Sequence, residues 1–429
     1  MSESKTICVI GAGIVGVSAA IWLLREGFQV VLVDKTGPAA GTSHGNAGVL
    51  AACSVVPVTV PGLIRKAPAM LFGRYEPLFL RWRHLPAMAP WLFEYLSHCK
   101  PDEVRRIARA LAPLTTDTLA QHRALAETTG AEKLVAAGDY VFGYQSKAHF
   151  AADQFGWQVR RENGFEWTEH DQQSFAATEP VFGNRVGYGV RVGNHGRILD
   201  PGLYVRDLAD HARAQGARIE VGSVDALVID DARVTGVRIN GQTLAADGLV
   251  VATGVWSGPL ASQLGIRVPM ESERGYHLEF WEADRMPADP VMLAAYKVVA
   301  TPMAGRLRLA GAVEFGGLNA PASDPPFEML THAIQELLPG IRYTRTEQWM
   351  GHRPAPSDSI PLIGQAPAVA GAWLAFGHHH IGLTTGPKTG RLIAQMIAGK
   401  STDIDMTAFD PGRFSRPGSD HQRRQVSRA

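Results

Sequence analysis

Three glycines near the amino terminus have the spacing of a phosphate-binding turn. Gly11, Gly13 and Gly16 follow an apolar run from Thr6 to Ile10, and Asp34 closes a second apolar run. The first glycine permits a tight turn, the second lets the backbone approach a pyrophosphate, and the third lets helix and strand pack closely. A carboxylate at Asp34 can accept hydrogen bonds from ribose hydroxyls. The pattern predicts a dinucleotide site without saying which dinucleotide.

The elements that must position this site form a β–α–β unit. Residues 6–10 are typical of a strand. The apolar pattern that follows them and stops at Gly27 is typical of a helix, and residues 30–33 are typical of a second strand. The helix would present free N–H groups and the positive end of its dipole to a phosphate. A glycine-rich turn without a ligand is the alternative, but it would not need the surrounding strand, helix and acid.

The segment after Asp34, residues 35–49, is rich in glycine, small residues and hydroxyls. Such a composition is typical of a solvent loop. A bound cofactor also needs close backbone approach and unobstructed N–H donors. Because the segment follows the nucleotide-binding unit directly, we expect it to contact the cofactor.

Composition narrows the class of protein. A chain of 429 residues is too long for one small core, which predicts two domains, and a net charge of +1 gives no footprint of a nucleic-acid binder. Cys8, Cys53 and Cys99 lie far apart, so neither a disulfide framework nor a structural zinc site is predicted. With no signal peptide and no apolar run of about 20 residues, a cytoplasmic protein is expected.

Residues 61–123 differ in composition from the rest of the chain, because tryptophans and leucines alternate with an excess of basic residues. The later part of this segment predicts amphipathic helices. One interpretation is a helical layer of a second domain with a solvated basic face. The other is a patch whose aromatic and basic side chains rest on an anionic membrane surface.

The remaining chain predicts further strands and helices. Asp200 and Pro201 are typical of a helix start, and Gly216 of its end. Residues 248–252 predict a buried strand that returns to the nucleotide site, so the cofactor domain is discontinuous. We expect strands near Tyr140 and Tyr188, in 218–245 and through most of 265–342, with a helix at 327–338. No regular element is expected in the proline-rich stretch 349–364, and a buried strand at 373–376 and a helix at 382–398 follow.

Taken together, these segments resemble the FAD-dependent D-amino acid oxidase superfamily, which includes D-amino acid oxidase, glycine oxidase, sarcosine oxidase and the small subunit of D-amino acid dehydrogenase. The resemblance runs from Thr6 to about Lys400. It rests on GAGIVG, GTSHGNAG, RILDPGLYVRDLADHA, ADGLVVATGVWSGPL, MGHRPAPSDSIPLIG and GHHHIGLTTGPKTGRLIAQMIAG. The small-residue segment and the basic-aromatic insert look closest to the D-amino acid dehydrogenase branch.

The resemblance implies an α/β FAD-binding domain, Rossmann-like and of the glutathione-reductase type, and an α+β substrate domain with a mainly antiparallel sheet. The FAD-binding domain is expected to comprise residues 1–60, 190–264 and 350–410. The substrate domain would comprise 61–189 and 265–349, and a disordered basic tail is expected at 411–429.

The resemblance also implies where FAD binds. Sarcosine-oxidase-type members attach the flavin through a cysteine in the C-terminal region; no cysteine follows Cys99 here, so the FAD is expected to be non-covalent. The implied cofactor-binding residues are Gly11, Gly13, Ile14, Val15, Gly16, Asp34, Lys35, Thr42, Ser43, Asn46, Ala47, Gly48, Val224, Ala252, Thr253, Gly254, Gly351, Gly377, Gly382, Leu383 and Thr384. A helix that begins at Gly382 would favour the negative charge of a reduced flavin, whereas a simple capped helix start is the alternative. Lys388 would add to that effect or else be solvated.

The candidate catalytic residues are Arg353, Tyr276 and His378. In the family the arginine of the R-P motif holds the substrate carboxylate, and the planar guanidinium of Arg353 suits this role; a structural salt bridge is the alternative. Tyr276 would hold or cover the substrate, or simply pack in its strand. His378 is expected beside the flavin ring. Its cluster with His44, His379 and His380 predicts no metal site, because adjacent side chains rarely converge on one ion.

The implied reaction is the oxidation of a D-amino acid, or a cyclic imino acid, by hydride transfer to flavin N5. Three rivals are an NAD-dependent dehydrogenase, a glycine- or sarcosine-type oxidase that uses oxygen, and a non-catalytic nucleotide-binding protein. The expected partners are a small amino acid and an electron acceptor, either oxygen or a membrane quinone, and not nucleic acid. The basic-aromatic insert favours the quinone and a place on the inner face of the membrane.

Overall fold

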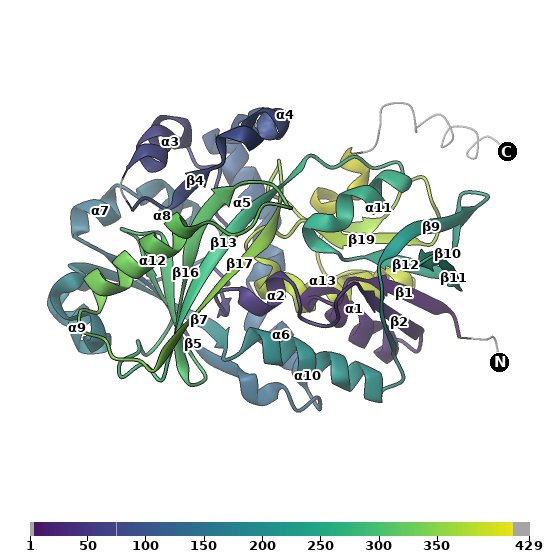
Figure 1. The fold of residues 1–429 in the computed structure, drawn as a ribbon, viewed down its shortest axis with the longest axis horizontal. Helices are drawn as coiled ribbons and strands as arrows, with labels where there is room; N and C mark the ends of the chain where they lie inside the picture. Colours follow the sequence, from purple (N-terminus) through teal and green to yellow (C-terminus); the bar gives the residue numbers. More distant parts are fainter. Residues whose placement is uncertain (1–3, 74, 415–429) are drawn as a thin grey trace.

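The computed structural model describes residues 4–73 and 75–414. Its strands form a six-stranded, a three-stranded and a ten-stranded sheet. Figure 1 shows the six- and three-stranded sheets at one end of the molecule, with β1, β2 and β12, and the ten-stranded sheet at the other end, with β13, β16 and β17. This is the expected two-domain α/β architecture, and that prediction is confirmed.

The six-stranded sheet is built around the predicted β–α–β unit, which consists of β1 (Thr6–Ile10), α1 (Ile14–Arg25) and β2 (Gln29–Asp34). Its strand order is β18-β19-β12-β1-β2-β8. β1 pairs in parallel with β2 and with β12 (Gly248–Val251), so the predicted buried returning strand is confirmed. The carboxyl ends of these parallel strands meet at one edge of the sheet, where ligands of α/β folds bind. The other strands are β8 (Arg218–Val221), β18 (Leu362–Gln365) and β19 (Ala372–Phe376).

Both faces of this sheet are covered. α1, α10 (Pro201–Ala214) and α13 (Gly382–Ile397) share one apolar core with β1. The antiparallel strands β9 (Val224–Asp230), β10 (Arg233–Ile239) and β11 (Gln242–Ala245) form the three-stranded sheet, whose apolar residues pack on the opposite face. The predicted start of α10 is confirmed, since the Asp200 carboxylate accepts a hydrogen bond from Leu203 N at 2.9 Å.

The ten-stranded sheet has the main strand order β17-β13-β16-β15-β14-β5-β7-β3, and most of its pairs are antiparallel. α12 (Asp324–Leu337) packs on one face through Phe327, Leu330 and Ile334. The strands predicted near Tyr140 and Tyr188 are confirmed as β5 and β7. The strands are β3 (Val49–Leu50), β4 (Leu78–Leu80), β5 (Val135–Tyr144), β6 (Thr168–Asp171), β7 (Tyr188–Ile198), β13 (Met270–Trp281), β14 (Val291–Leu293), β15 (Val298–Met303), β16 (Arg306–Phe315) and β17 (Arg345–Pro356).

The prediction of no regular element in residues 349–364 is wrong. Most of this stretch forms the second half of β17 and the first part of β18. β17 ends the strand order and pairs with β13 alone in that order, with Pro354 opposite Ser272 and Pro356 opposite Met270. An edge strand tolerates proline because its outward side needs no N–H donor.

The basic-aromatic insert is helical, as predicted for its later part. It contains α3 (Leu63–Phe72), α4 (Leu85–Ser97), α5 (Pro101–Thr115) and α6 (Thr118–Ala126). Ile107, Leu111 and Leu125 of α5 and α6 join the core around α1 and α13. Shorter helices are α2 (Thr42–Gly45), α7 (Lys147–Ala151), α8 (Gln154–Glu162), α9 (Gln172–Thr178) and α11 (Gly258–Gln263). Among residues 4–73 and 75–414, no helix is long and apolar enough to cross a membrane.

The first four residues of the predicted disordered tail, 411–429, have regular structure. Pro411–Phe414 form a short 3-10 helix, and Arg413 Nε donates to Asp358 Oδ2 at 2.8 Å. The predicted disorder from residue 411 is therefore wrong for these four residues, and 415–429 lie outside the described residues. The boundaries of the two domains stay a prediction; β7 and β17, which belong to the large sheet, run across two of them.

Close packing of α1 on α13 depends on glycine. A Cβ atom on Gly390 of α13 would lie 2.5 Å from Ala19 N of α1, so the helices would have to separate. We expect Gly390→Ala to lower the free energy of unfolding by about 1–3 kcal/mol through overpacking. Urea unfolding measures this, and Gly258→Ala is the matched control because a Cβ there meets no atom within 4 Å. Equal midpoints for both variants would contradict the packing argument.

Candidate active site

A cavity of about 1400 Å³ is lined by residues of both larger sheets. It brings together residues far apart in the sequence, from Gly11 and Asp34 at the small sheet to Arg353 on β17. Of the predicted cofactor-binding residues, all except Gly16 and Gly377 line this cavity. Their contact with a cofactor stays a prediction, but the structure gathers them in one place.

The nucleotide end of the cavity is shaped by the turn after β1. Gly11 has φ +104°, and a Cβ atom there would lie 2.5 Å from Ala252 O on the neighbouring strand end. Its N–H donates to Val33 O at 2.7 Å. Gly16 lies behind this turn, where a Cβ atom would fall 1.8 Å from Gly11 O. Only glycine fits at both positions, as the sequence pattern predicts.

Asp34 both lines the cavity and builds its wall. One carboxylate oxygen accepts from Ala12 N at 2.9 Å, and the other accepts from Thr36 N at 2.9 Å and Gly37 N at 3.0 Å. These bonds hold the turns after β1 and β2 at a fixed separation. Next to it, Lys35 Nζ lies 3.9 Å from the centre of the Trp256 ring.

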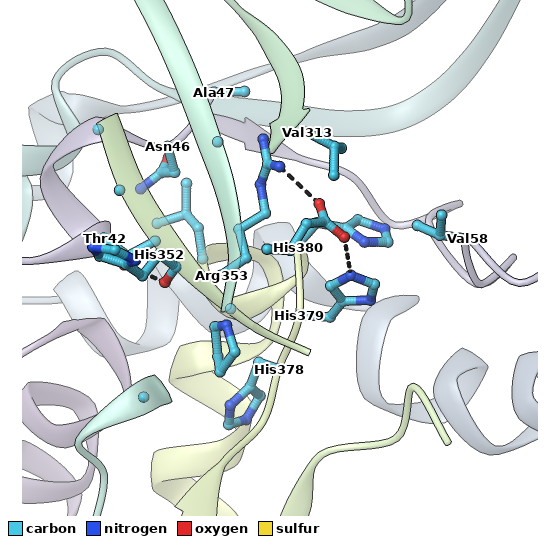
Figure 2. A pocket seen from close by; sticks show the side chains of 18 of the residues that line it. Thr42, Asn46, Ala47, Val58, Val313, His352, Arg353, His378, His379 and His380 are labelled. Carbon is cyan, nitrogen blue, oxygen red and sulfur yellow. Dashed lines mark hydrogen bonds and ion pairs between the residues drawn. The ribbon is translucent and has the colours of Figure 1, made fainter. Parts of the chain in front are cut away.

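The segment that includes α2 is tied to both sheets, so the solvent-loop interpretation is not supported. Ser43 Oγ accepts from Ile14 N, at the start of α1, at 2.9 Å. Thr42 Oγ1 donates to His352 O of β17 at 2.7 Å, as Figure 2 shows. Gly48 N donates to Asn46 Oδ1 at 2.8 Å. The small side chains thus hold the loop along the cavity.

Arg353 lies on β17, next to His352, whose carbonyl accepts from Thr42. Its Nη1 donates to Glu273 Oε1 at 2.7 Å and to Ala312 O at 3.2 Å. Gly275 makes room for the guanidinium, since a Cβ atom there would lie 2.4 Å from Arg353 Cζ. Of the three guanidinium nitrogens of Arg353, Nη1 alone has hydrogen-bond partners among the described residues. The side chain is 22% exposed. The other N–H groups remain available to an anion.

Glu273 is the functional residue that sequence reasoning missed. It is buried on β13, where Oε1 pairs with Arg353 and Oε2 accepts from His379 Nε2 at 2.6 Å (Figure 2). Burial alone would raise the pKa of Glu273, but His379 and then Arg353 outweigh it and hold the pKa far below its usual range. The carboxylate is therefore charged at neutral pH.

His379 reaches Glu273 from an unusual backbone conformation. Its φ is +47°, in the left-handed region that non-glycine residues rarely adopt, and its N–H donates to Pro354 O at 2.9 Å. Such a conformation costs free energy and persists where its surroundings require it. The short bond to the buried Glu273 carboxylate provides that requirement.

Tyr276 does not share the Arg353 face of β13. It lies an odd number of residues from Glu273, so its side chain points to the opposite face of the sheet, where the ring meets Phe327 at 5.0 Å and the hydroxyl donates to Glu314. This geometry favours the packing role over the predicted catalytic one. The residue is buried at 1% exposure.

His378 also faces away from Arg353 in Figure 2. Its Nε2 lies 3.1 Å from Thr389 Oγ1 of α13, and burial lowers its pKa to about 3, so the ring is neutral. This geometry favours a structural contact over the predicted catalytic role. The side chains of His378 and His379 therefore point to different partners. The described residues contain no group of three His, Cys, Asp or Glu placed to hold a metal ion.

Lys388 is neither solvated nor directed at the cavity, so both interpretations of it are wrong. It is buried in α13, and its Nζ donates to Asp117 at 2.9 and 3.0 Å and to Pro113 O at 2.7 Å. The sequence does not predict this pair because Asp117, the residue just before α6, is far from Lys388 in the chain. The lysine fastens α13 to the helical insert.

Comparison with known proteins identifies the family. The model of the FAD dependent oxidoreductase (DAO) family matches residues 6–396. The chain belongs to this family. The family's members use FAD, and the residues of this oxidoreductase fit that cofactor.

The fit to FAD rests on the glycines of the cavity wall. At Gly41 and Gly254, both of which line the cavity, a Cβ atom would meet no protein atom within 4 Å. These positions leave open space beside the Gly11 turn and the start of α1, where a pyrophosphate is favoured. Gly351 and Gly275 lie opposite each other on β17 and β13, and a Cβ atom on either would meet a protein side chain, Trp349 or Arg353.

Two relatives and one solved structure are similar to this oxidoreductase over nearly its whole length. The D-amino-acid oxidase of Bradyrhizobium diazoefficiens is 37% identical over 421 residues, covering 96% of this chain and 100% of the relative. A D-amino acid dehydrogenase of Cereibacter sphaeroides is 32% identical, covering 96% of both chains. The glycine oxidase of Geobacillus kaustophilus has the same fold, with a TM-score of 0.72 at 20% identity, covering 96% of this chain and 100% of the other.

We expect Glu273→Gln to destabilise the protein by about 3 kcal/mol, because Arg353 and His379 lose the charge between them. Since the pKa of Glu273 is lowered on folding, the stabilisation is fully present above the ordinary value of 4.5 and is lost as the pH falls below it. Urea unfolding between pH 7 and pH 3 should show the difference between the native protein and the variant shrinking with acidity.

The matched control is Glu220→Gln, which breaks the exposed pair of Arg218 and Glu220. A surface pair contributes little, so this variant should unfold at the native midpoint. A Glu273→Gln variant as stable as this control at pH 7 would show that the buried pair does not hold the site.

Proposed function

We propose that the protein oxidises the Cα–N bond of a D-amino acid, or of a cyclic imino acid, with bound FAD. The observation that carries this proposal is Arg353, a guanidinium in the cavity wall whose Nη1 is held by Glu273 while other N–H groups remain available. The D configuration is supported by the two relatives named D-amino-acid oxidase and D-amino acid dehydrogenase.

In this proposal each residue of the site has a defined task. Arg353 binds the substrate carboxylate through charge-assisted hydrogen bonds. Glu273 and Ala312 O hold the guanidinium in place, and Gly275 leaves it room. Bound FAD supplies the two-electron oxidation. A side-chain base is not required when the amine binds in its neutral form, and the neutral ring of His378 adds no charge near it.

FAD itself would be held by the cavity residues around the Gly11 turn. The Gly11 turn and the start of α1 would receive the pyrophosphate, and Asp34 the adenosine ribose. Val224, at the start of β9, and Gly254, after β12, would flank it. The start of α13 at Gly382 would face the flavin ring, where the helix dipole favours negative charge.

The function is tested first by absorbance. The purified protein should carry bound flavin, and anaerobic addition of a D-amino acid should bleach its visible absorption. A colourless protein, or a flavin that no D- or L-amino acid bleaches, would reject the proposal in favour of a nucleotide-binding protein without this activity.

Arg353→Lys then tests the anchor. Lysine keeps the positive charge beside Glu273 but loses the planar fork, so KM should rise about tenfold to a hundredfold while kcat changes less. Steady-state kinetics measure both constants. Arg213→Lys, in an exposed pair with Asp210, is the matched control and should keep the native KM. An unchanged KM in Arg353→Lys would reject the carboxylate role.

We also propose that the basic-aromatic insert rests on an anionic membrane surface. Ile64, Phe72, Trp82 and Phe93 are 60%, 74%, 57% and 77% exposed. They belong to α3, α4 and the short 3-10 helix Trp82–His84; Figure 1 shows α3 and α4 at one corner, and the rings of Phe72 and Trp82 stack at 5.9 Å. Exposed Arg65 and Arg83 lie beside them in sequence. Aromatic and basic side chains together suit an anionic lipid surface.

A membrane site also bears on the electron acceptor. α3 and α4 line the same cavity as Arg353, so a molecule dissolved in the membrane would meet the cavity from this corner. We therefore favour a membrane quinone over oxygen, and a cytoplasmic protein bound to the inner face of the membrane.

Sedimentation with vesicles tests the membrane proposal. The protein should pellet with vesicles that contain phosphatidylglycerol and remain in solution with neutral phosphatidylcholine. Replacing Trp82 and Phe93 together by Ser should weaken binding at least about tenfold, since two large apolar side chains no longer enter the interface. Tyr343→Ser, at an exposed aromatic outside the insert, is the control. An absence of binding to anionic vesicles would remove the argument for a quinone.

A further inference from the structure

α3 has an apolar side that packs on no part of the protein core. Leu63, Ala67, Met70 and Leu71 recur at helical spacing and all line the cavity. Each of them is half-buried, and within the described chain none belongs to an apolar core cluster. An amphipathic helix normally buries this side against protein. Here the side faces the cavity.

The chain leads from α3 directly to the neighbourhood of Arg353. α3 packs on β4, and β4 pairs in parallel with β16, with Leu78 opposite Val313. Val313 follows Ala312, whose carbonyl accepts from Arg353 Nη1. Figure 2 shows Val313 beside the ion pair of Arg353 with Glu273. The apolar side of α3 therefore lines the same cavity as Arg353, and β4 joins this helix to the strand whose Ala312 carbonyl holds the guanidinium.

The charges of the cavity lining oppose a charged side chain on the substrate. The acidic residues among the described cavity lining are Asp34, Asp153, Asp225 and Glu273. Each already accepts hydrogen bonds from the protein: Asp153 from Tyr144, Asp225 from Gly241 N, and Glu273 from Arg353 and His379. A cationic side chain would therefore find no unpaired carboxylate in this lining, and a charged group placed against the leucines of α3 would lose its hydration.

We infer that the substrate is an amino acid with a large apolar side chain, enclosed by Leu63, Ala67 and Leu71 of α3 and by Val313 of β16 while Arg353 holds its carboxylate. This inference rests on the proposed function and adds the substrate class. The side chain of the substrate replaces cavity water on the apolar side of α3, which provides the burial that the helix lacks within the protein. The bound substrate then packs against the apolar side of α3, which forms one wall of the cavity.

The holoenzyme tests this with a panel of D-amino acids. kcat/KM for D-leucine, D-methionine and D-phenylalanine should exceed that for D-alanine about tenfold to a hundredfold, because each buried methylene multiplies it several-fold. D-aspartate and D-arginine should be poorer still. If D-alanine or a charged amino acid is preferred, the inference is wrong while the proposed function stands. If no amino acid reduces the flavin, the proposed function fails as well.

Variants on α3 assign the preference to this helix. Leu71→Asp should reduce the ratio of kcat/KM for D-leucine over D-alanine at least about tenfold, because a carboxylate enters the apolar wall. Ala69→Asp is the matched control, since Ala69 is exposed on the same helix and lies outside the cavity lining; its ratio should stay native. Both variants should bind FAD and unfold at the native midpoint. An unchanged ratio in a folded, flavin-loaded Leu71→Asp protein would overturn the role of α3.

Discussion

The active site depends on one buried carboxylate. Glu273 is buried between Arg353 and His379, and its negative charge balances the charge and the N–H donors of these two neighbours. Glu273 also links two elements, because its partner Arg353 belongs to β17 and its partner His379 to the loop before α13. The loop that runs toward the cofactor end and the strand that carries the anchor are thereby held at one separation.

The two sheets contribute different properties to the cavity between them. The parallel sheet supplies backbone N–H groups, glycine turns and a helix start, which suit phosphates. The antiparallel sheet supplies long strands with side chains in register, so Glu273 and Arg353 lie directly opposite each other. In the proposed function, the backbone groups of the first sheet would bind the dinucleotide and the side chains of the second would bind the substrate carboxylate.

The sequence predicted the parts whose signals are local. The Gly11 to Asp34 unit and the start of α10 depend on neighbouring residues, and both were recognised from their spacing. β17 was missed because its prolines argue against a strand until the edge position is known. Glu273, its bond to His379 and the burial of Lys388 depend on partners many residues away, which no local pattern reports. Only the pairing of β17 with β13 places Glu273 opposite Arg353.

The prolines of β17 have a consequence for how the molecule meets other molecules. An edge strand normally exposes N–H and C=O groups that a foreign strand can pair with, and native proteins blunt such edges. Pro354 and Pro356 have no N–H group, and both lie within three residues after Arg353. Both prolines are buried, and their carbonyls accept from His379 N at 2.9 Å and from Ser359 N at 3.0 Å, so the protein's own loops already cover this part of the edge and leave no place for a foreign strand beside Arg353.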